Sequence, residues 1–175
     1  MTGGTESNKA GSALILDSFL PYRLSVATNL VSDLVAAAYR QLFGIDIPEW
    51  RLIAVLAERT ESNQQGLGEA TRMDKLTVSR AAARLARRGL ILRRVSEQDR
   101  RNQLLTLSDD GRALYEHVAP KALEIEKMIF DRLSETQKAE FSIMLREIEA
   151  AALKAASEML NPDATAVLTP KRRSA

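Results

Sequence analysis

The stretch KLTVSRAAARLARRGLILRRV, residues 75–95, carries the strongest fold signal in this chain of 175 residues, because a helical period gives way there to a β-prone run. At about 100° per residue, Val78, Ala82 and Leu85 fall within about 60° of each other on one side of a helix. The opposite side gathers Thr77, Arg80, Arg84 and Arg87 within about 80°. Gly89 supplies the C-terminal stop. The stretch therefore predicts a helix with one packing face and one face for water or phosphate.

Positive charge is concentrated around this helix. The whole chain has a formal charge of +2, but residues 72–101 hold ten lysines and arginines against three acids. That window is +7, which leaves −5 for the remainder of the chain. A basic block in an otherwise acidic protein is typical of a surface that binds a polyanion, because neutralising phosphates releases condensed counterions. A solvated basic helix face is the alternative that charge alone leaves open.

The order of the expected elements is that of a winged helix-turn-helix domain. Helical spacing extends over 21–43 and ends at Gly44, and Pro48 fits the first turn of a second helix. A short helix is expected within 64–72, followed by a turn and the basic helix. The β-prone segments 90–95 and 103–107 then bracket a polar tip, as in a hairpin. In this order the basic helix enters the major groove and the hairpin forms the wing.

Two more helices are expected after the hairpin, one from a cap at Ser108 to about Leu133 and one, capped by Ser134, over 135–160. The fold class is mainly α with a small β-hairpin wing. We expect a winged helix-turn-helix DNA-binding domain at 47–111, a helical dimerisation region from 14–46 and 112–160, and disordered tails at 1–13 and 161–175.

The terminal helices carry apolar residues that a single subunit need not bury, notably Leu16, Phe19, Leu20, Ile143, Leu153 and Leu160. A C2 homodimer would bury them and match a palindromic site on double-stranded DNA. The alternative is that these apolar residues pack on the core of their own subunit, which accounts for some of the residues whatever the oligomeric state.

Two arginines follow an aspartate at the expected wing tip, Asp99, Arg100 and Arg101. A cation at a wing tip can reach the minor groove, where negative potential is concentrated, and an aspartate can orient a guanidinium through a bidentate pair. The alternative is a local surface salt bridge across the turn, worth at most about 1 kcal/mol.

The segments IPEWRLIAVLAE, residues 47–58, and GLGEATRMDKLTVSRAAARLARRGLILRRVSEQDRRNQLLTLSDDGRALYE, residues 66–116, resemble the DNA-binding domain of the multiple-antibiotic-resistance regulator (MarR) family. Asp99, Arg101, Leu107 and Gly111 match the family's wing pattern, and Ser108 replaces the usual threonine while keeping its capping hydroxyl. The resemblance spans about 16–160. It implies a homodimeric bacterial transcription factor, usually a repressor, in a family where many members bind small aromatic acids.

The resemblance and the basic helix face together give the candidate residues. The DNA-binding candidates are Lys75, Thr77, Ser79, Arg80, Arg84, Arg87, Asp99, Arg100 and Arg101. Family ligands sit between the dimer helices and the DNA-binding lobe, which implies effector-pocket candidates by location only: Tyr22, Arg23, Trp50 and Arg51. For Trp50, an ordinary core position is the favoured alternative.

Composition excludes several other classes of protein. The chain has no cysteine and one histidine, His117, so we expect no disulfide, no metal site, no cofactor and no cysteine redox switch. No nucleophile and base pair and no Gly-rich phosphate loop is evident, so we do not expect an enzyme. No apolar run of 18 residues and no signal peptide is evident, so we expect a cytoplasmic protein.

The alternative function is a helical protein-interaction module whose basic helix meets an acidic partner. Such a module would need neither the hairpin nor its Asp-Arg tip.

Overall fold

The computed structural model describes residues 14–95 and 103–160. The chain divides into two compact units, Met1–Ile125 and Glu126–Ala175, and we describe each by itself. The boundary falls inside the region 112–160, which the sequence assigns to dimerisation. Within the described ranges, no helix combines the length and the apolar character needed to cross a lipid bilayer.

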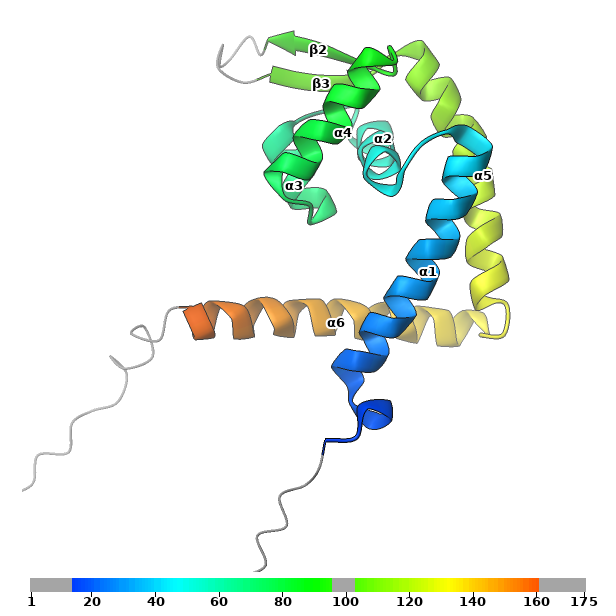
Figure 1. The fold of residues 1–175 in the computed structure, drawn as a ribbon, viewed down its shortest axis with the longest axis vertical. Coiled ribbons are helices and arrows are strands. Elements are labelled where there is room, and N and C mark those ends of the chain that lie inside the picture. Colours follow the sequence, from blue (N-terminus) through cyan, green and yellow to red (C-terminus); the bar gives the residue numbers. More distant parts are fainter. Residues whose placement is uncertain (1–13, 96–102, 161–175) are drawn as a thin grey trace, which may run out of the picture. The chain divides into compact units, whose positions relative to one another are not determined.

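The elements follow the predicted order, with two additions (Figure 1). They are η1 Leu16–Ser18, α1 Leu20–Phe43, α2 Ile47–Arg59, β1 Glu61–Asn63, α3 Gln64–Thr71, α4 Lys75–Arg87, β2 Ile91–Val95, β3 Gln103–Leu107, α5 Asp109–Phe130 and α6 Glu135–Leu160. Each predicted helix and both predicted strands are present, so the fold class is confirmed. The short 3-10 helix η1 and the strand β1 are not predicted by the sequence.

Local capping explains where the helices begin and end. Gly44 adopts a left-handed φ of 61° and ends α1 as predicted. At the start of α2, the Asp46 carboxylate accepts the Glu49 N–H at 3.1 Å, and the Glu49 carboxylate accepts the Asp46 N–H at 2.9 Å. Ser134 caps α6 as predicted, because its Oγ accepts the Gln137 N–H at 3.2 Å.

The sheet has three antiparallel strands in the order β1-β3-β2. Strands β2 and β3 form the predicted hairpin, with Ile91 opposite Leu107. Strand β1 adds to the free edge of β3, with Ser62 opposite Leu105. The sequence does not predict β1, because its three polar residues show neither alternation nor branched side chains and become a strand only through pairing with β3.

One apolar core joins α2, α3 and α4 to the sheet. The cluster contains the buried residues Leu52, Ile53, Leu56, Leu67, Val78, Ala81, Ala82, Leu85, Leu90, Ile91 and Leu105. The three α4 residues that the helical period places on the packing face, Val78, Ala82 and Leu85, are fully buried. Burial of a valine or leucine side chain contributes about 1.5–3 kcal/mol, so the core fixes which face of α4 stays at the surface.

Helix α5 leaves the sheet through a close backbone contact between Gly111 and Leu90. The Ser108 N–H donates to the Leu90 carbonyl at 3.1 Å, and the Ser108 hydroxyl accepts the Gly111 N–H at 3.0 Å, which confirms the predicted cap. A Cβ atom at position 111 would lie 1.9 Å from the Leu90 carbonyl oxygen. Glycine is therefore required at this contact.

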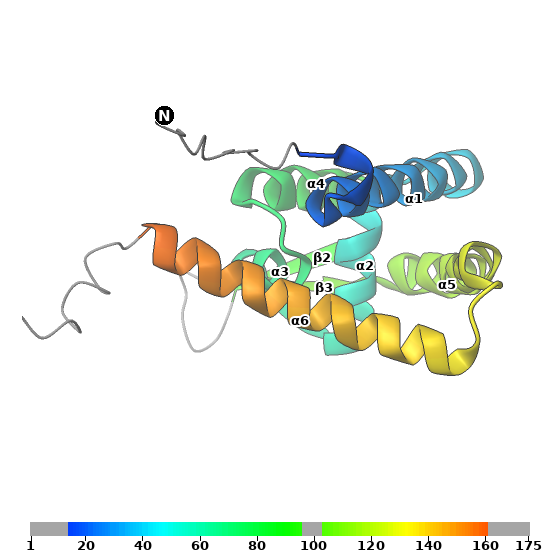
Figure 2. The same cartoon turned by 90° about the horizontal axis from the view of Figure 1, so that it is seen from below.

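The second unit contains the end of α5 and the whole of α6. The rings of Phe130 and Phe141 lie 6.2 Å apart between centroids. Figure 2 shows α6 as one long helix, and none of its described side chains is buried. Its exposed large apolar side chains are Phe141, Ile143, Met144, Ile148, Leu153 and Met159.

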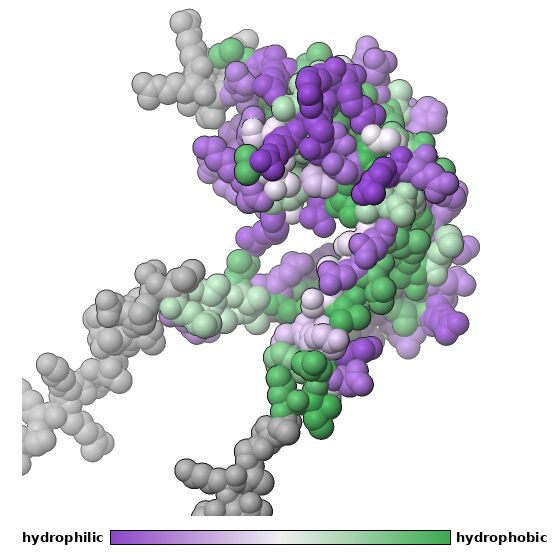
Figure 3. Space-filling view, in the orientation of Figure 1, coloured by the Kyte–Doolittle hydropathy of each residue, from purple (hydrophilic) through white to green (hydrophobic). Residues whose placement is uncertain are grey.

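A second set of exposed apolar residues lies in the first unit, around η1 and the start of α1. Leu14, Ile15, Leu16, Phe19 and Leu20 are between 40% and 78% exposed. Figure 3 shows this end of the chain as a dense apolar patch beside the residues drawn in grey. The dimerisation role of 14–46 and 112–160 stays a prediction.

Candidate nucleic-acid interface

A three-residue turn joins α3 to α4. Arg72 adopts a left-handed φ of 55° and ends α3. Asp74 caps α4, since its carboxylate accepts the Thr77 hydroxyl at 2.6 Å and the Thr77 N–H at 2.9 Å. The hydrogen bond from the Thr77 hydroxyl is the main cause that holds the pKa of Asp74 below its ordinary value, and the bond from the Thr77 N–H adds to it. The hydroxyl hydrogen of Thr77 is therefore used within the protein.

The surface of α4 opposite the core is a row of residues spaced for one helix face: Leu76, Arg80, Ala83 and Arg87, all exposed. Lys75 is exposed beside this row, and Ser79 is half-buried. Among the residues that the structure describes, neither Arg80 nor Arg87 forms an ion pair. Their cationic groups are thus available to a ligand.

Sequence reasoning missed Leu76 as a candidate. The side chain is 57% exposed and lies in the same row as Arg80. The signal was available in the sequence, because the helical period puts this leucine opposite Val78 and Leu85. Its apolar surface adds a second kind of contact to an otherwise polar and cationic face.

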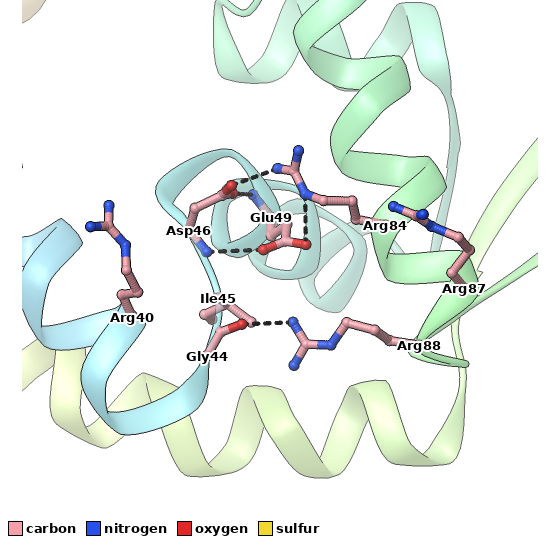
Figure 4. Close-up of a pocket in the computed structure, with 8 residues that line it drawn as sticks. All are labelled: Arg40, Gly44, Ile45, Asp46, Glu49, Arg84, Arg87 and Arg88. Carbon is pink, nitrogen blue, oxygen red and sulfur yellow. Dashed lines mark hydrogen bonds and ion pairs between the residues drawn. The ribbon is translucent and has the colours of Figure 1, made fainter.

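Arg84 does not point away from the protein with Arg80. Its Nε–H donates to Glu49 Oε1 at 3.1 Å and its Nη2–H to Asp46 Oδ2 at 2.6 Å (Figure 4). Glu49 is 4% exposed, and the Arg84 side chain is 36% exposed. Burial lowers the pKa of Arg84, but the Glu49 hydrogen bond and the charges of Asp46 and Glu49 outweigh it, so the pKa lies above its ordinary value. Arg84 is a cation that is already paired.

The ends of α1 and α4 and the start of α2 line a cleft of about 540 Å³ around this pair (Figure 4). The lining residues are Arg40, Gly44, Ile45, Asp46, Glu49, Arg84, Arg87 and Arg88. Arg88 Nη1 donates to the Gly44 carbonyl at 2.9 Å. Arg84 of α4 and Arg88, which caps this helix, therefore tie the C-terminal end of α4 to the junction between α1 and α2.

The expected wing can be followed only in part. On β2, Arg94 pairs with Glu61 of β1, which is a contact that the unpredicted strand makes possible. Asp99, Arg100 and Arg101 lie outside the described residues. Their assignment to the wing tip stays a prediction.

The structure does not bring the four effector-pocket candidates together within one subunit. Tyr22 and Arg23 lie in the first turn of α1, whereas Trp50 and Arg51 lie beyond its other end. The intervening helix alone spans about 30 Å at 1.5 Å per residue. Arg23 lies 3.7 Å from Asp17, and none of the four candidates lines the cleft around Arg84. An effector pocket at these residues stays a prediction.

Trp50 lies in an aromatic cluster next to the core. Its ring is stacked on Tyr115 of α5, with centroids 5.7 Å apart and planes 14° apart. It meets Tyr39 of α1 edge-on at 5.6 Å. This position supports the interpretation of Trp50 as a packing residue, because its faces are shared between α1 and α5.

A helix-turn-helix whose second helix presents free cations, followed by a small antiparallel sheet, defines a winged helix protein. Residues 43–102 match the sequence model of the MarR family. The resemblance to the MarR family drawn from the sequence is confirmed by this match and by solved structures of MarR family regulators that share the fold.

Solved structures of this family share the fold. A MarR/EmrR family transcriptional regulator from Acinetobacter sp. ADP1 is 26% identical, over 81% of this chain and 99% of its own, with a TM-score of 0.75. A probable transcriptional regulator from Pseudomonas aeruginosa is 29% identical, over 77% and 99%, with a TM-score of 0.69. Sco3205, a MarR family regulator from Streptomyces coelicolor solved in complex with DNA, is 24% identical, over 82% and 92%, with a TM-score of 0.73. No curated protein sequence matches this chain.

Proposed function

We propose that the protein is a sequence-specific DNA-binding regulator, a ligand-responsive repressor that binds a palindromic operator as a homodimer. The observation that carries the proposal is the exposed row on α4, where Arg80 and Arg87 form no ion pair with any residue in the described ranges and lie opposite a fully packed face. A recognition helix needs this combination, because its packing side holds it rigid while its free side meets base edges in the major groove.

Within this row the cations take two roles. Arg80 lies at the middle of the exposed face, where a guanidinium can make a bidentate contact with the O6 and N7 atoms of guanine. Lys75 and Arg87 lie at the two ends of α4 and are assigned to phosphates, which position the helix without reading sequence. Ser79 and the oxygen of Thr77 remain available as hydrogen-bond acceptors.

The first experiment selects an operator from a pool of random duplexes and follows binding by fluorescence anisotropy. Wild-type affinity for any duplex should fall as salt rises, because each neutralised phosphate releases counterions. Arg80→Ala should remove the preference at the base pair that Arg80 reads, which reduces discrimination there by about 1–3 kcal/mol.

Arg132→Ala is the matched control, since Arg132 is an exposed arginine outside the basic block. It should leave both the affinity and the base preferences unchanged. If no duplex binds even at low salt, the proposed function is wrong and a helix that meets an acidic protein partner becomes the better explanation. If Arg80→Ala behaves like Arg132→Ala, the assignment of Arg80 to a base is wrong.

We assign Leu76 to the methyl group of a thymine. An exposed leucine on a recognition helix can shield that methyl group, the one apolar feature of the major groove. Replacing each operator thymine in turn by deoxyuridine should reveal one position where affinity falls about fourfold, the value of roughly 0.8 kcal/mol for one methyl group. Leu76→Ala should abolish the sensitivity at that position.

Leu123→Ala serves as the control for this experiment, because Leu123 is 65% exposed on α5. That variant should keep the full deoxyuridine effect. A methyl effect that persists unchanged in Leu76→Ala would assign the thymine contact to another residue.

The dimer in this proposal uses the exposed apolar residues of η1, α1 and α6. A single exposed leucine needs no explanation, but many exposed large apolar side chains on both terminal helices favour an interface. A C2 dimer places two copies of α4 on two half-sites, about 34 Å apart, which is the reason for a palindromic operator.

The effector in this proposal is a small aromatic acid. Similar structures include BpsR from Bordetella bronchiseptica, whose DNA binding is regulated by 6-hydroxynicotinic acid, and CouR from Rhodococcus jostii RHA1, bound to p-coumaroyl-CoA. Such a ligand weakens operator binding only if it prefers a dimer geometry in which the two recognition helices no longer match the half-sites.

A further inference from the structure

We propose that Arg84 is a positioning residue, which sets the orientation of α4 by binding the first turn of α2 and does not read a base. This inference rests on the proposed DNA-binding function. It also changes the role expected for Arg84 from its place on the helical wheel, where it lies on the same side as Arg80.

The first support is the direction of the side chain. The guanidinium of Arg84 turns toward α2, where it meets Glu49 and Asp46 at 3.1 and 2.6 Å (Figure 4). The Nε–H and one Nη2–H are thereby used, and two carboxylates balance its charge. Three N–H donors of Arg84 stay unused by these carboxylates, but the two ion pairs hold the guanidinium toward α2.

The second support is that both carboxylates are held in place without Arg84. Asp46 and Glu49 form the capping box of α2, in which each carboxylate accepts the other residue's backbone N–H. Arg84 therefore binds a preformed pair of acceptors at a fixed point of the fold. Together with the packed face of α4, this attachment limits rotation of the helix about its own axis.

The third support is the burial of Glu49, which is 4% exposed. A buried carboxylate is tolerated only when it is paired and hydrogen-bonded, and Arg84 is its cationic partner. The pair joins residues 35 positions apart in the sequence. If Arg84 moved to DNA, it would leave this charge uncompensated.

Rotation of α4 matters because the DNA-facing residues lie on the same helix. Arg80 precedes Arg84 by one helical turn, and Leu76 precedes Arg80 by another. The core already fixes which face of α4 is exposed, and the contact between Arg84 and α2 refines the direction in which both side chains face the groove. Arg88 strengthens the attachment by donating to the Gly44 carbonyl at 2.9 Å.

The experiment measures operator affinity and the base preference at each operator position for Arg84→Gln, Glu49→Gln and the double variant. Positioning by this pair predicts that either single change lowers operator affinity about tenfold and weakens all the preferences read by α4 together. The double variant should lose no more than the weaker-binding single variant, because both changes break the same contact.

Glu49→Gln gives the sharpest result, because it removes a negative charge from a DNA-binding protein and keeps the size of the side chain. Simple electrostatics predicts tighter binding, whereas loss of positioning predicts weaker binding. Glu58→Gln is the matched control, since Glu58 is an exposed acid on the same helix. It should not weaken operator binding.

Two results would overturn the inference. One is loss of preference at a single base pair in Arg84→Gln, which is the signature of a base-reading residue. The other is unchanged or tighter operator binding by Glu49→Gln. If Arg84→Gln does not fold, as judged by its urea midpoint, Glu49→Gln alone decides. If the wild-type chain selects no operator, the proposed function itself is wrong. This outcome differs from failure of the Arg84 inference, in which the wild type still selects an operator.

Discussion

Gly111→Ala is expected to lose about 3–5 kcal/mol of the free energy of unfolding, a large part of the total for a domain of this size. The added Cβ would lie 1.9 Å from the Leu90 carbonyl oxygen and 3.0 Å from its carbon. Neither backbone can move freely, because Ser108 is hydrogen-bonded to both Leu90 and Gly111. The start of α5 would have to separate from the sheet. Urea unfolding, followed by circular dichroism, measures the loss.

Gly68→Ala is the control for this substitution. Gly68 lies within α3, and a Cβ atom there would lie 3.2 Å from the Met73 carbonyl oxygen and 3.8 Å from a Val78 methyl group. A small shift relieves that contact, and alanine is favoured over glycine in a helix by about 1 kcal/mol. Gly68→Ala should therefore be close to neutral. An unchanged urea midpoint for Gly111→Ala would show that α5 does not approach the sheet as described.

Ile148→Glu is expected to convert the proposed dimer to a monomer and to weaken operator binding by about 100-fold or more. Ile148 is 49% exposed at the middle of α6, among its unburied apolar side chains. A charge there would be buried without a partner in an apolar interface. Sedimentation should give twice 19.4 kDa for the wild type and 19.4 kDa for the variant.

Two further measurements separate loss of the dimer from loss of DNA contacts. On a duplex with one half-site, Ile148→Glu and the wild type should bind with the same affinity. The variant loses only the contribution of the partner subunit's DNA-binding domain, which has no half-site to bind on this duplex. Ser142→Glu places the same charge at an exposed position of α6 that carries no large apolar side chain, and it should stay dimeric. A dimeric Ile148→Glu with full operator affinity would mean that the interface lies elsewhere.

Much of the fold is readable from local sequence, because each of its helices has its own signals. The packing face of α4, the glycine stop at Gly44 and the caps at Ser108 and Ser134 are all local and were all predicted correctly. Strand β1 was not predicted, because its three polar residues acquire strand geometry only from a partner more than 40 residues away.

The exposed cationic face of α4 can be read from the sequence, but the contacts of its individual side chains cannot. A helical wheel shows the side of α4 on which Arg84 lies, but not what packs beside it, and the acids that bind it come from α2. The capping pattern of Asp46 and Glu49 is itself visible in the sequence, but its second use as an acceptor pair for Arg84 is not. The effector candidates were chosen by family location, and the length of α1 separates them in one subunit.

The contacts of Trp50 with Tyr115, on which it is stacked, and with Tyr39, which it meets edge-on, make it a useful probe of this protein. Trp50 is the only tryptophan in the chain, so all indole emission comes from the point where α1, α2 and α5 meet. Any event that shifts one of these helices changes the packing around a single, chemically unmodified fluorophore. Ligand titrations and unfolding of this junction can therefore be followed in the native chain without a label.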